Sequence, residues 1–95
     1  MLQIGRIESR QRRRNVRVEV RLFATFARFA PMKRAGEPFE VALPASTSID
    51  DLLHHLGIPP AEVHLTMVDG RIVHDRCARL PDGARVGLFP PVGGG

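Results

Sequence analysis

Hydrophobic and charged residues alternate along the chain from residue 16. The apolar positions of this first stretch are Val16, Val18, Val20 and Leu22. A period of two residues is typical of a β-strand with one buried and one exposed face. Residues 39–43 alternate in the same way and predict a second strand that Pro44 ends. Between the two strands, residues 23–37 predict a loop or short turn that Phe26 and Phe29 hold in place.

A short amphipathic helix is predicted after the second strand. Its apolar face consists of Ile49, Leu52, Leu53 and Leu56. Ser48 is expected to cap the N-terminus, and Asp51 suits the first turn because unpaired N–H groups there favour negative charge. Gly57 suits the left-handed conformation that follows a helix end. A helix of this length is unstable alone, so we expect it to lie on a sheet.

Three more strands are predicted in the second half of the chain. The first is indicated by alternating apolar residues at Val63, Leu65 and Met67. The dipeptide at 69–70, Asp-Gly, predicts a two-residue turn into a strand at 72–73. A further turn at 81–83 leads to a last strand over 86–89. The element order predicts an α+β fold, in which a mixed sheet of four to five strands carries one main covering helix.

The positive charge of the chain is concentrated at its N-terminus. The 95 residues suffice for one small domain, and the formal charge of +4 first suggests a nucleic-acid partner. Residues 1–15 hold five arginines against one glutamate, which accounts for the whole excess. We therefore expect a basic, disordered arm over 1–15, a domain over 16–89 and a flexible tail over 90–95. Nucleic acid is an unlikely partner for the neutral domain.

Common catalytic and metal-binding motifs are missing from the sequence. His54 and His55 are neighbours on the predicted helix and point about 100° apart, which does not suit a ligand pair. His74 and Cys77 have a ligand-like gap but no second pair beside them, so no metal site is predicted. Cys77 cannot form an internal disulfide. With no export signal or membrane-length apolar run, a cytoplasmic protein without a membrane partner is expected.

The C-terminal segment is the most distinctive part of the chain. Phe89 is followed by two prolines, one valine and three glycines. Proline stiffens the exit from the last strand, and glycine makes the end thin and conformationally free. Six residues can extend about 20 Å, enough to place a terminal carboxylate inside the cleft of another protein. The alternative interpretation is a frayed terminus without a role.

Together these features resemble the MoaD/ThiS family of ubiquitin-like sulfur carriers, which have the β-grasp fold. The resemblance covers nearly all of residues 16–95, and the matching segments are VRLFATF, TSIDDLLHHLGIP, VDGRIV and LPDGARVGLFPPVGGG. The ending, an aromatic residue with Pro-Pro, a small spacer and Gly-Gly, is similar to the small subunit of molybdopterin synthase more than to the thiamine carrier. Asp69 stands where the hairpin turn commonly has asparagine, Gly93 adds a third glycine, and the basic arm lies outside the resemblance.

The resemblance implies that the protein is a carrier and not an enzyme, at most the non-catalytic small subunit of a synthase. An E1-like activating enzyme would use ATP to adenylate the carboxylate of Gly95, and a sulfur donor would convert the adenylate into a thiocarboxylate. Gly93 and Gly94 would thread into the activating enzyme. The residues expected to dock on partners are Phe89, Pro90, Pro91 and Val92. No cofactor is expected to stay bound.

The resemblance also implies molybdopterin biosynthesis, for a molybdenum or tungsten cofactor, with a molybdopterin-synthase large subunit as a further partner. Two alternatives remain open at this point. The carrier could serve thiamine, cysteine or a thiolated natural product, or Gly95 could be joined to lysines as in ubiquitin-like modifiers. A nucleic-acid module, which would rest on the arm alone, comes last.

Overall fold

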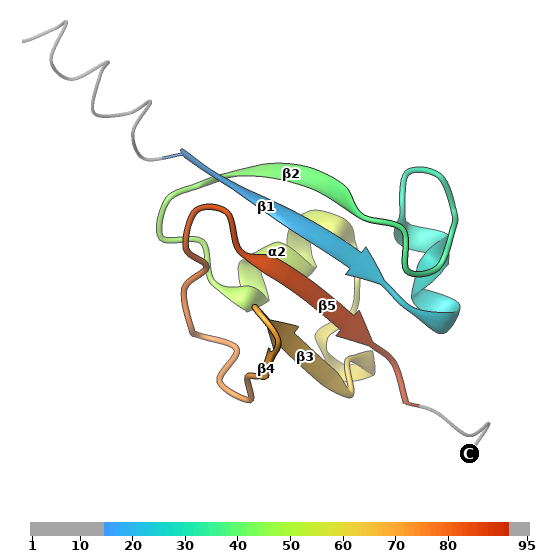
Figure 1. Cartoon of the computed structure of the whole chain (residues 1–95). Coiled ribbons are helices and arrows are strands. Elements are labelled where there is room, and N and C mark those ends of the chain that lie inside the picture. Colours follow the sequence, from blue (N-terminus) through green and yellow to red (C-terminus); the bar gives the residue numbers. More distant parts are fainter. Residues whose placement is uncertain (1–14, 92–95) are drawn as a thin grey trace, which may run out of the picture.

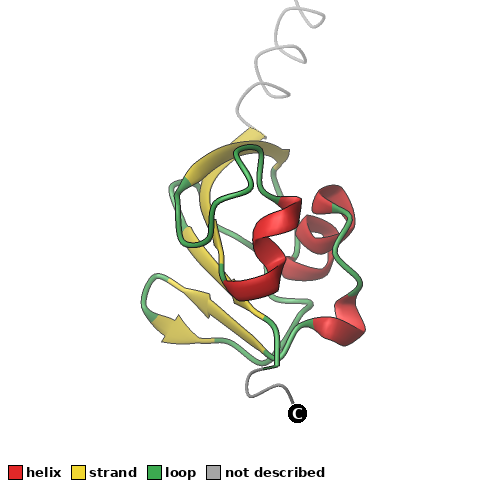
Figure 2. Ribbon diagram, turned by 90° about the vertical axis from the view of Figure 1, so that its right-hand side faces the viewer, coloured by secondary structure: helices red, strands yellow, loops and turns green. Residues whose placement is uncertain are grey.

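The computed structural model describes residues 15–91, which form a five-stranded sheet with helices on one of its faces (Figures 1 and 2). The elements in chain order are β1 (Asn15–Leu22), the 3-10 helix η1 (Ala24–Phe29), β2 (Phe39–Pro44), α2 (Ile49–Leu56), the 3-10 helix η2 (Pro60–Glu62), β3 (Leu65–Val68), β4 (Arg71–Ile72) and β5 (Arg85–Phe89). The predicted order of strands and helix is confirmed. Most of the expected arm and the end of the tail lie outside the described residues, and Asn15 already belongs to β1.

The sheet has the strand order β2-β1-β5-β3-β4. The first and last strands of the chain, β1 and β5, run parallel at its centre, and Val20 pairs with Val86. β2 is antiparallel to β1, while β3 is antiparallel to β5 and forms a hairpin with β4. In Figure 1, β5 crosses the middle of the domain between β1 and β3. This mixed sheet with one covering α-helix confirms the β-grasp fold.

The hydrophobic core lies between the sheet and the helices. β1 contributes every second residue to it, and Val20 and Leu22 are completely buried. On the other side, α2 presents the face that its sequence spacing predicted, and η1 adds a buried aromatic ring. The fully buried residues from these two helices are Phe26, Ile49, Leu52 and Leu53. The helix is therefore stabilised by its contact with the sheet, because eight residues are too few to be helical alone.

The two ends of α2 are capped as the sequence predicted. The Ser48 hydroxyl accepts a hydrogen bond from the N–H of Asp51 at 3.1 Å, and the Asp51 carboxylate accepts one from the N–H of Ser48 at 3.1 Å. Gly57 ends the helix in the left-handed conformation at φ 79°. The pKa of Asp51 is lowered from its ordinary 3.8, first by the backbone N–H of Ser48 and then by its side chain.

The segment after β1 is more ordered than the predicted loop or short turn. It contains the six-residue helix η1, whose Phe26 is fully buried and packs edge-on against Phe29 at a centroid distance of 6.1 Å. Burial of an aromatic ring stabilises a local helix that composition alone does not favour. The helix begins at Ala24, which has a positive φ of 53°.

The third strand starts later than predicted. η2 occupies the preceding residues, and the N–H of Val63 donates to the carbonyl oxygen of Pro60 at 3.1 Å, so strand pairing begins only at Leu65. Within β3 the buried residue is Thr66, which is 4% exposed. Leu65 and Met67, one residue to either side, therefore lie on the opposite face of the sheet.

Candidate functional site

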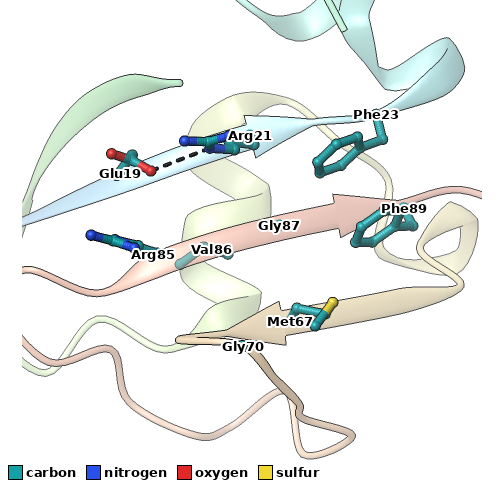
Figure 3. Close-up of a pocket in the computed structure, with 9 residues that line it drawn as sticks. All are labelled: Glu19, Arg21, Phe23, Met67, Gly70, Arg85, Val86, Gly87 and Phe89. Atoms are coloured by element: carbon teal, nitrogen blue, oxygen red, sulfur yellow. Dashed lines mark hydrogen bonds and ion pairs between the residues drawn. The ribbon is translucent and has the colours of Figure 1, made fainter. Parts of the chain in front are cut away.

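The face of the sheet turned away from α2 carries a groove of about 310 Å³ (Figure 3). β5 forms its floor, and its sides come from the second half of β1, from β3 and from the hairpin turn after β3. The lining residues are Glu19, Arg21, Phe23, Met67, Gly70, Arg85, Val86, Gly87 and Phe89. We refer to this set as the outer groove. It has one apolar end and one charged end.

Two stacked phenylalanines form the apolar end of the outer groove. The rings of Phe23 and Phe89 are parallel within 2°, with centroids 4.3 Å apart. They lie beside Gly87, where an added Cβ would be 3.4 Å from a carbon of each ring. Gly87 does not have a positive φ, so the close approach of the rings, and not the backbone conformation, is what favours glycine here. Met67, directly across from Gly87 on β3, extends the apolar surface.

The charged end of the outer groove carries Glu19, Arg21 and Arg85. The Arg21 Nε lies 3.3 Å from a Glu19 carboxylate oxygen; the Arg21 side chain is exposed and that of Glu19 is partly exposed. An exposed ion pair of this kind adds little stability, so it is free to rearrange when a partner binds. Arg85 forms no ion pair with another residue between 15 and 91. With two cations and one anion, this end suits a partner with a surplus of negative charge.

The C-terminal tail leaves the sheet at the apolar end of the outer groove. The carbonyl oxygen of Phe89 accepts a hydrogen bond from the N–H of His64 at 2.8 Å, which fixes the last residue of β5. Pro90 is buried and Pro91 is exposed. Of the expected site residues, Val92, Gly93, Gly94 and Gly95 lie outside the described residues. The structure thus places Phe89 in the groove, with the tail starting beside it.

Sequence reasoning did not identify Phe23, Met67 or Gly87 as part of this surface. A signal was present for Phe23, because it continues the outward-facing positions of β1 after Glu19 and Arg21. A large apolar residue in an otherwise charged, outward register indicates a surface that contacts something. Gly87 gave no such signal, since its neighbours are two rings from different strands.

Comparison with known proteins identifies the family. The model described as "ThiS family" matches residues 20–95, which include every strand and helix from the end of β1 onward. The chain belongs to the ThiS family. The resemblance to MoaD/ThiS-type ubiquitin-like sulfur carriers is thereby confirmed. No curated protein matches the chain in sequence.

Solved structures similar to this ThiS-family chain come from archaea and bacteria. The solution structure of the Haloferax volcanii HVO 2177 protein is 26% identical, with a TM-score of 0.67, over 86% of this chain and 89% of that one. A Pyrococcus furiosus protein assigned as subunit 1 of a molybdopterin converting factor is 29% identical, with a TM-score of 0.63, over 81% and 99%. A complex of subunits 1 and 2 of that factor from Helicobacter pylori matches at 22% identity and a TM-score of 0.53, over 84% and 100%, and shows the fold alone.

Other reactive side chains of this ThiS-family protein lie away from the outer groove. His54 and His55 are exposed on α2, and the Nδ1 of His54 lies 3.1 Å from the carbonyl oxygen of Asp50. Cys77 is an exposed thiol whose N–H donates to the Asp75 carboxylate at 2.9 Å. Within residues 15–91, no three His, Cys, Asp or Glu side chains are grouped to hold a metal ion. No helix in this range is long and apolar enough to cross a membrane.

Proposed function

We propose that this protein carries sulfur as a thiocarboxylate on Gly95. The supporting observation is that β5 forms the floor of the outer groove and its last residue, Phe89, leads directly into the tail. A partner that covers the groove therefore meets the tail at its origin. Membership of the ThiS family supports the sulfur chemistry.

The proposed reaction needs an activating enzyme because a carboxylate is a poor acyl donor. One carboxylate oxygen of Gly95 attacks the α-phosphorus of ATP, which releases pyrophosphate and forms an acyl-adenylate. Hydrosulfide delivered by the sulfur donor then attacks the carbonyl carbon, AMP leaves with the original carboxylate oxygen, and loss of the sulfur-bound proton gives the thiocarboxylate. The activating enzyme is E1-like and holds the ATP, so the carrier needs no bound cofactor. Gly93 and Gly94 allow the narrow approach because they have no side chains.

We propose that the residues around the start of the tail contact the partners. Phe89 and Pro91 present apolar surface, and Val92 follows them along the tail. The buried ring of Pro90 instead fixes the direction in which the chain leaves the sheet. Central aromatic residues that lose water on binding contribute most of the affinity in many interfaces. Phe23 and Phe89 fit this description.

We further propose that the sulfur is used in molybdopterin synthesis and that one partner is the large subunit of the synthase. The similarity to the Pyrococcus furiosus subunit 1 protein supports this assignment. The large subunit would cover the outer groove while the thiocarboxylate enters its active site. In this arrangement the carrier supplies the sulfur atom and the large subunit supplies the catalytic groups.

Intact-mass measurement after incubation with the activating enzyme, ATP and a sulfur donor tests this proposal. The expected product has one oxygen at Gly95 replaced by sulfur, as mapped by fragmentation. Removal of Gly94 and Gly95 should abolish this product and leave the thermal unfolding midpoint unchanged. Cys77→Ser is the matched control and should load normally. Sulfur on Cys77, or equal loading of the truncated chain, would show that the carboxylate is not the carrier group.

A further inference from the structure

A second hollow, of about 180 Å³, lies at the edge of the sheet, between the start of β3 and the segment that follows β4, and is distinct from the outer groove. Its lining residues are Val63, His64, Leu65, Thr66, Val73, His74 and Arg76. We refer to this set as the edge hollow. It brings together one guanidinium and two imidazoles, and no carboxylate side chain lines it. A polar hollow that offers a guanidinium and imidazole N–H donors, with no carboxylate in its lining, suits an anion.

Arg76 is held in position by hydrogen bonds from two directions. Its Nη1 donates to the carbonyl oxygen of Pro60, and its own carbonyl oxygen accepts from the N–H of Asp50 at 3.0 Å. A guanidinium has five N–H donors in one plane. Within residues 15–91, Arg76 uses only the one that binds Pro60. Arg76 is half-buried and forms no ion pair with any residue from 15 to 91. A partly buried guanidinium with unused N–H donors can bind an anion beside it.

The other polar members of the edge hollow lie in β3 or in the segments beside it. Thr66 is buried, and its carbonyl oxygen accepts the N–H of Val73 at 2.9 Å, which closes the hairpin at this point. His74 follows directly and is exposed. His64 connects the hollow to the tail exit, because its N–H donates to Phe89. The edge hollow and the start of the tail thus share one residue.

We propose that the edge hollow binds a small oxyanion, either phosphate or carboxylate. The guanidinium of Arg76 would bind two oxygens at once, and the hydroxyl of Thr66 and the imidazoles of His64 and His74 would supply further donors. Two sources offer this chemistry. One is a free phosphate-class anion such as the pyrophosphate that adenylation releases. The other is the carboxylate at the end of the tail, since four residues after Pro91 can reach about 13 Å.

Titration of the full chain with inorganic phosphate and with pyrophosphate, followed by NMR at constant ionic strength, tests the proposal. We expect saturable shifts of the amide signals of His64 and His74 and of the Arg76 Nε–H signal. Arg76→Gln should weaken the apparent affinity at least ten-fold. Arg79→Gln removes the same charge from an exposed arginine outside the hollow and should bind as the unchanged chain does. His74→Gln, which breaks no hydrogen bond found in residues 15–91, should weaken binding while the fold is kept.

The same NMR experiment distinguishes the two sources of the oxyanion. With glycine labelled at its carboxyl carbon, a shift of the Gly95 signal in Arg76→Gln but not in Arg79→Gln identifies the tail as the occupant. Saturable binding of added phosphate without any change at Gly95 identifies a free anion. Two results together would overturn the proposal: phosphate-induced shifts that do not saturate, and a Gly95 carboxyl signal that is the same in Arg76→Gln as in the unchanged chain. So would equal responses of Arg76→Gln and Arg79→Gln. Neither result depends on whether the tail accepts sulfur.

Discussion

The two faces of the sheet are built from the same strands but differ in how far their apolar side chains are buried. On the inner face, Val20, Leu22 and Leu88 are completely shielded from water by the helices. On the outer face, Phe23, Met67 and Phe89 stay partly exposed although they are equally apolar. Burial of the inner set stabilises the fold in the isolated protein. No residue between 15 and 91 covers the outer set, so one strand pattern builds the core on one side and leaves an apolar surface on the other.

The largest effect on folding should come from the inner face. Leu53→Ala removes a fully buried side chain from α2 and leaves a cavity against the sheet. We expect the free energy of unfolding to fall by about 2–5 kcal/mol, as measured by urea denaturation. Met67→Ala on the outer face is the matched control and should change it by less than about 1 kcal/mol. Similar losses in the two variants would contradict the division between the faces.

The largest effect on association should come from the apolar end of the outer groove. Phe89→Ala removes one of the two stacked rings and should weaken binding to the proposed partners, the activating enzyme and the large subunit, by about 2 kcal/mol, roughly 30-fold. Titration calorimetry measures this directly. Met32→Ala is the control, because Met32 is apolar and 63% exposed but does not line the groove. Undiminished affinity of Phe89→Ala would show that partners bind elsewhere.

Gly87→Ala should weaken partner binding without lowering stability. The new methyl group would lie 3.4 Å from a carbon of each ring, at the close limit of ordinary contact, and would fill part of the apolar end of the groove, which should weaken partner binding about five-fold. Alanine is less flexible than glycine in a strand, so the free energy of unfolding should stay the same or rise by about 0.5 kcal/mol. Calorimetry and urea denaturation on the same sample test both expectations. A large loss of stability would mean that the rings are part of the core.

The smallest effect concerns the cap that holds α2 over the inner face. The folded-state pKa of Asp51 is depressed, so its stabilising effect is present above the unfolded value of 3.8 and is lost as pH falls through the lower folded value. Asp51→Asn should therefore be less stable than the unchanged chain near neutral pH and equally stable at strongly acidic pH. Urea midpoints of both proteins between these limits test the prediction. If the two urea midpoints differ by the same amount at every pH, the charge of Asp51 does not contribute and only the geometry of its hydrogen bond matters.

Most of the inner face could be predicted from the sequence because burial there follows local periodicity. The spacing from Ile49 to Leu56 and the caps at Ser48 and Gly57 identified α2 and its buried side. The outer face could not be predicted in this way. Alternation in β3 shows that Leu65 and Met67 share a face, but it does not show that this face is the uncovered one. Phe23, just after β1, and Phe89, at the end of β5, are 66 positions apart in the sequence, and their rings stack only once the sheet is assembled.

The central position of β5 has a mechanical consequence. This strand is hydrogen-bonded to β1 on one side and to β3 on the other, and it runs parallel to β1. A pulling force on the chain beyond Phe89 would act along β5 and would shear its hydrogen bonds to both β1 and β3. The hydrogen bonds must then break together, whereas those of an edge strand can be peeled off singly. The domain should therefore resist a pull on its C-terminal end better than a domain whose last strand lies at the edge of the sheet.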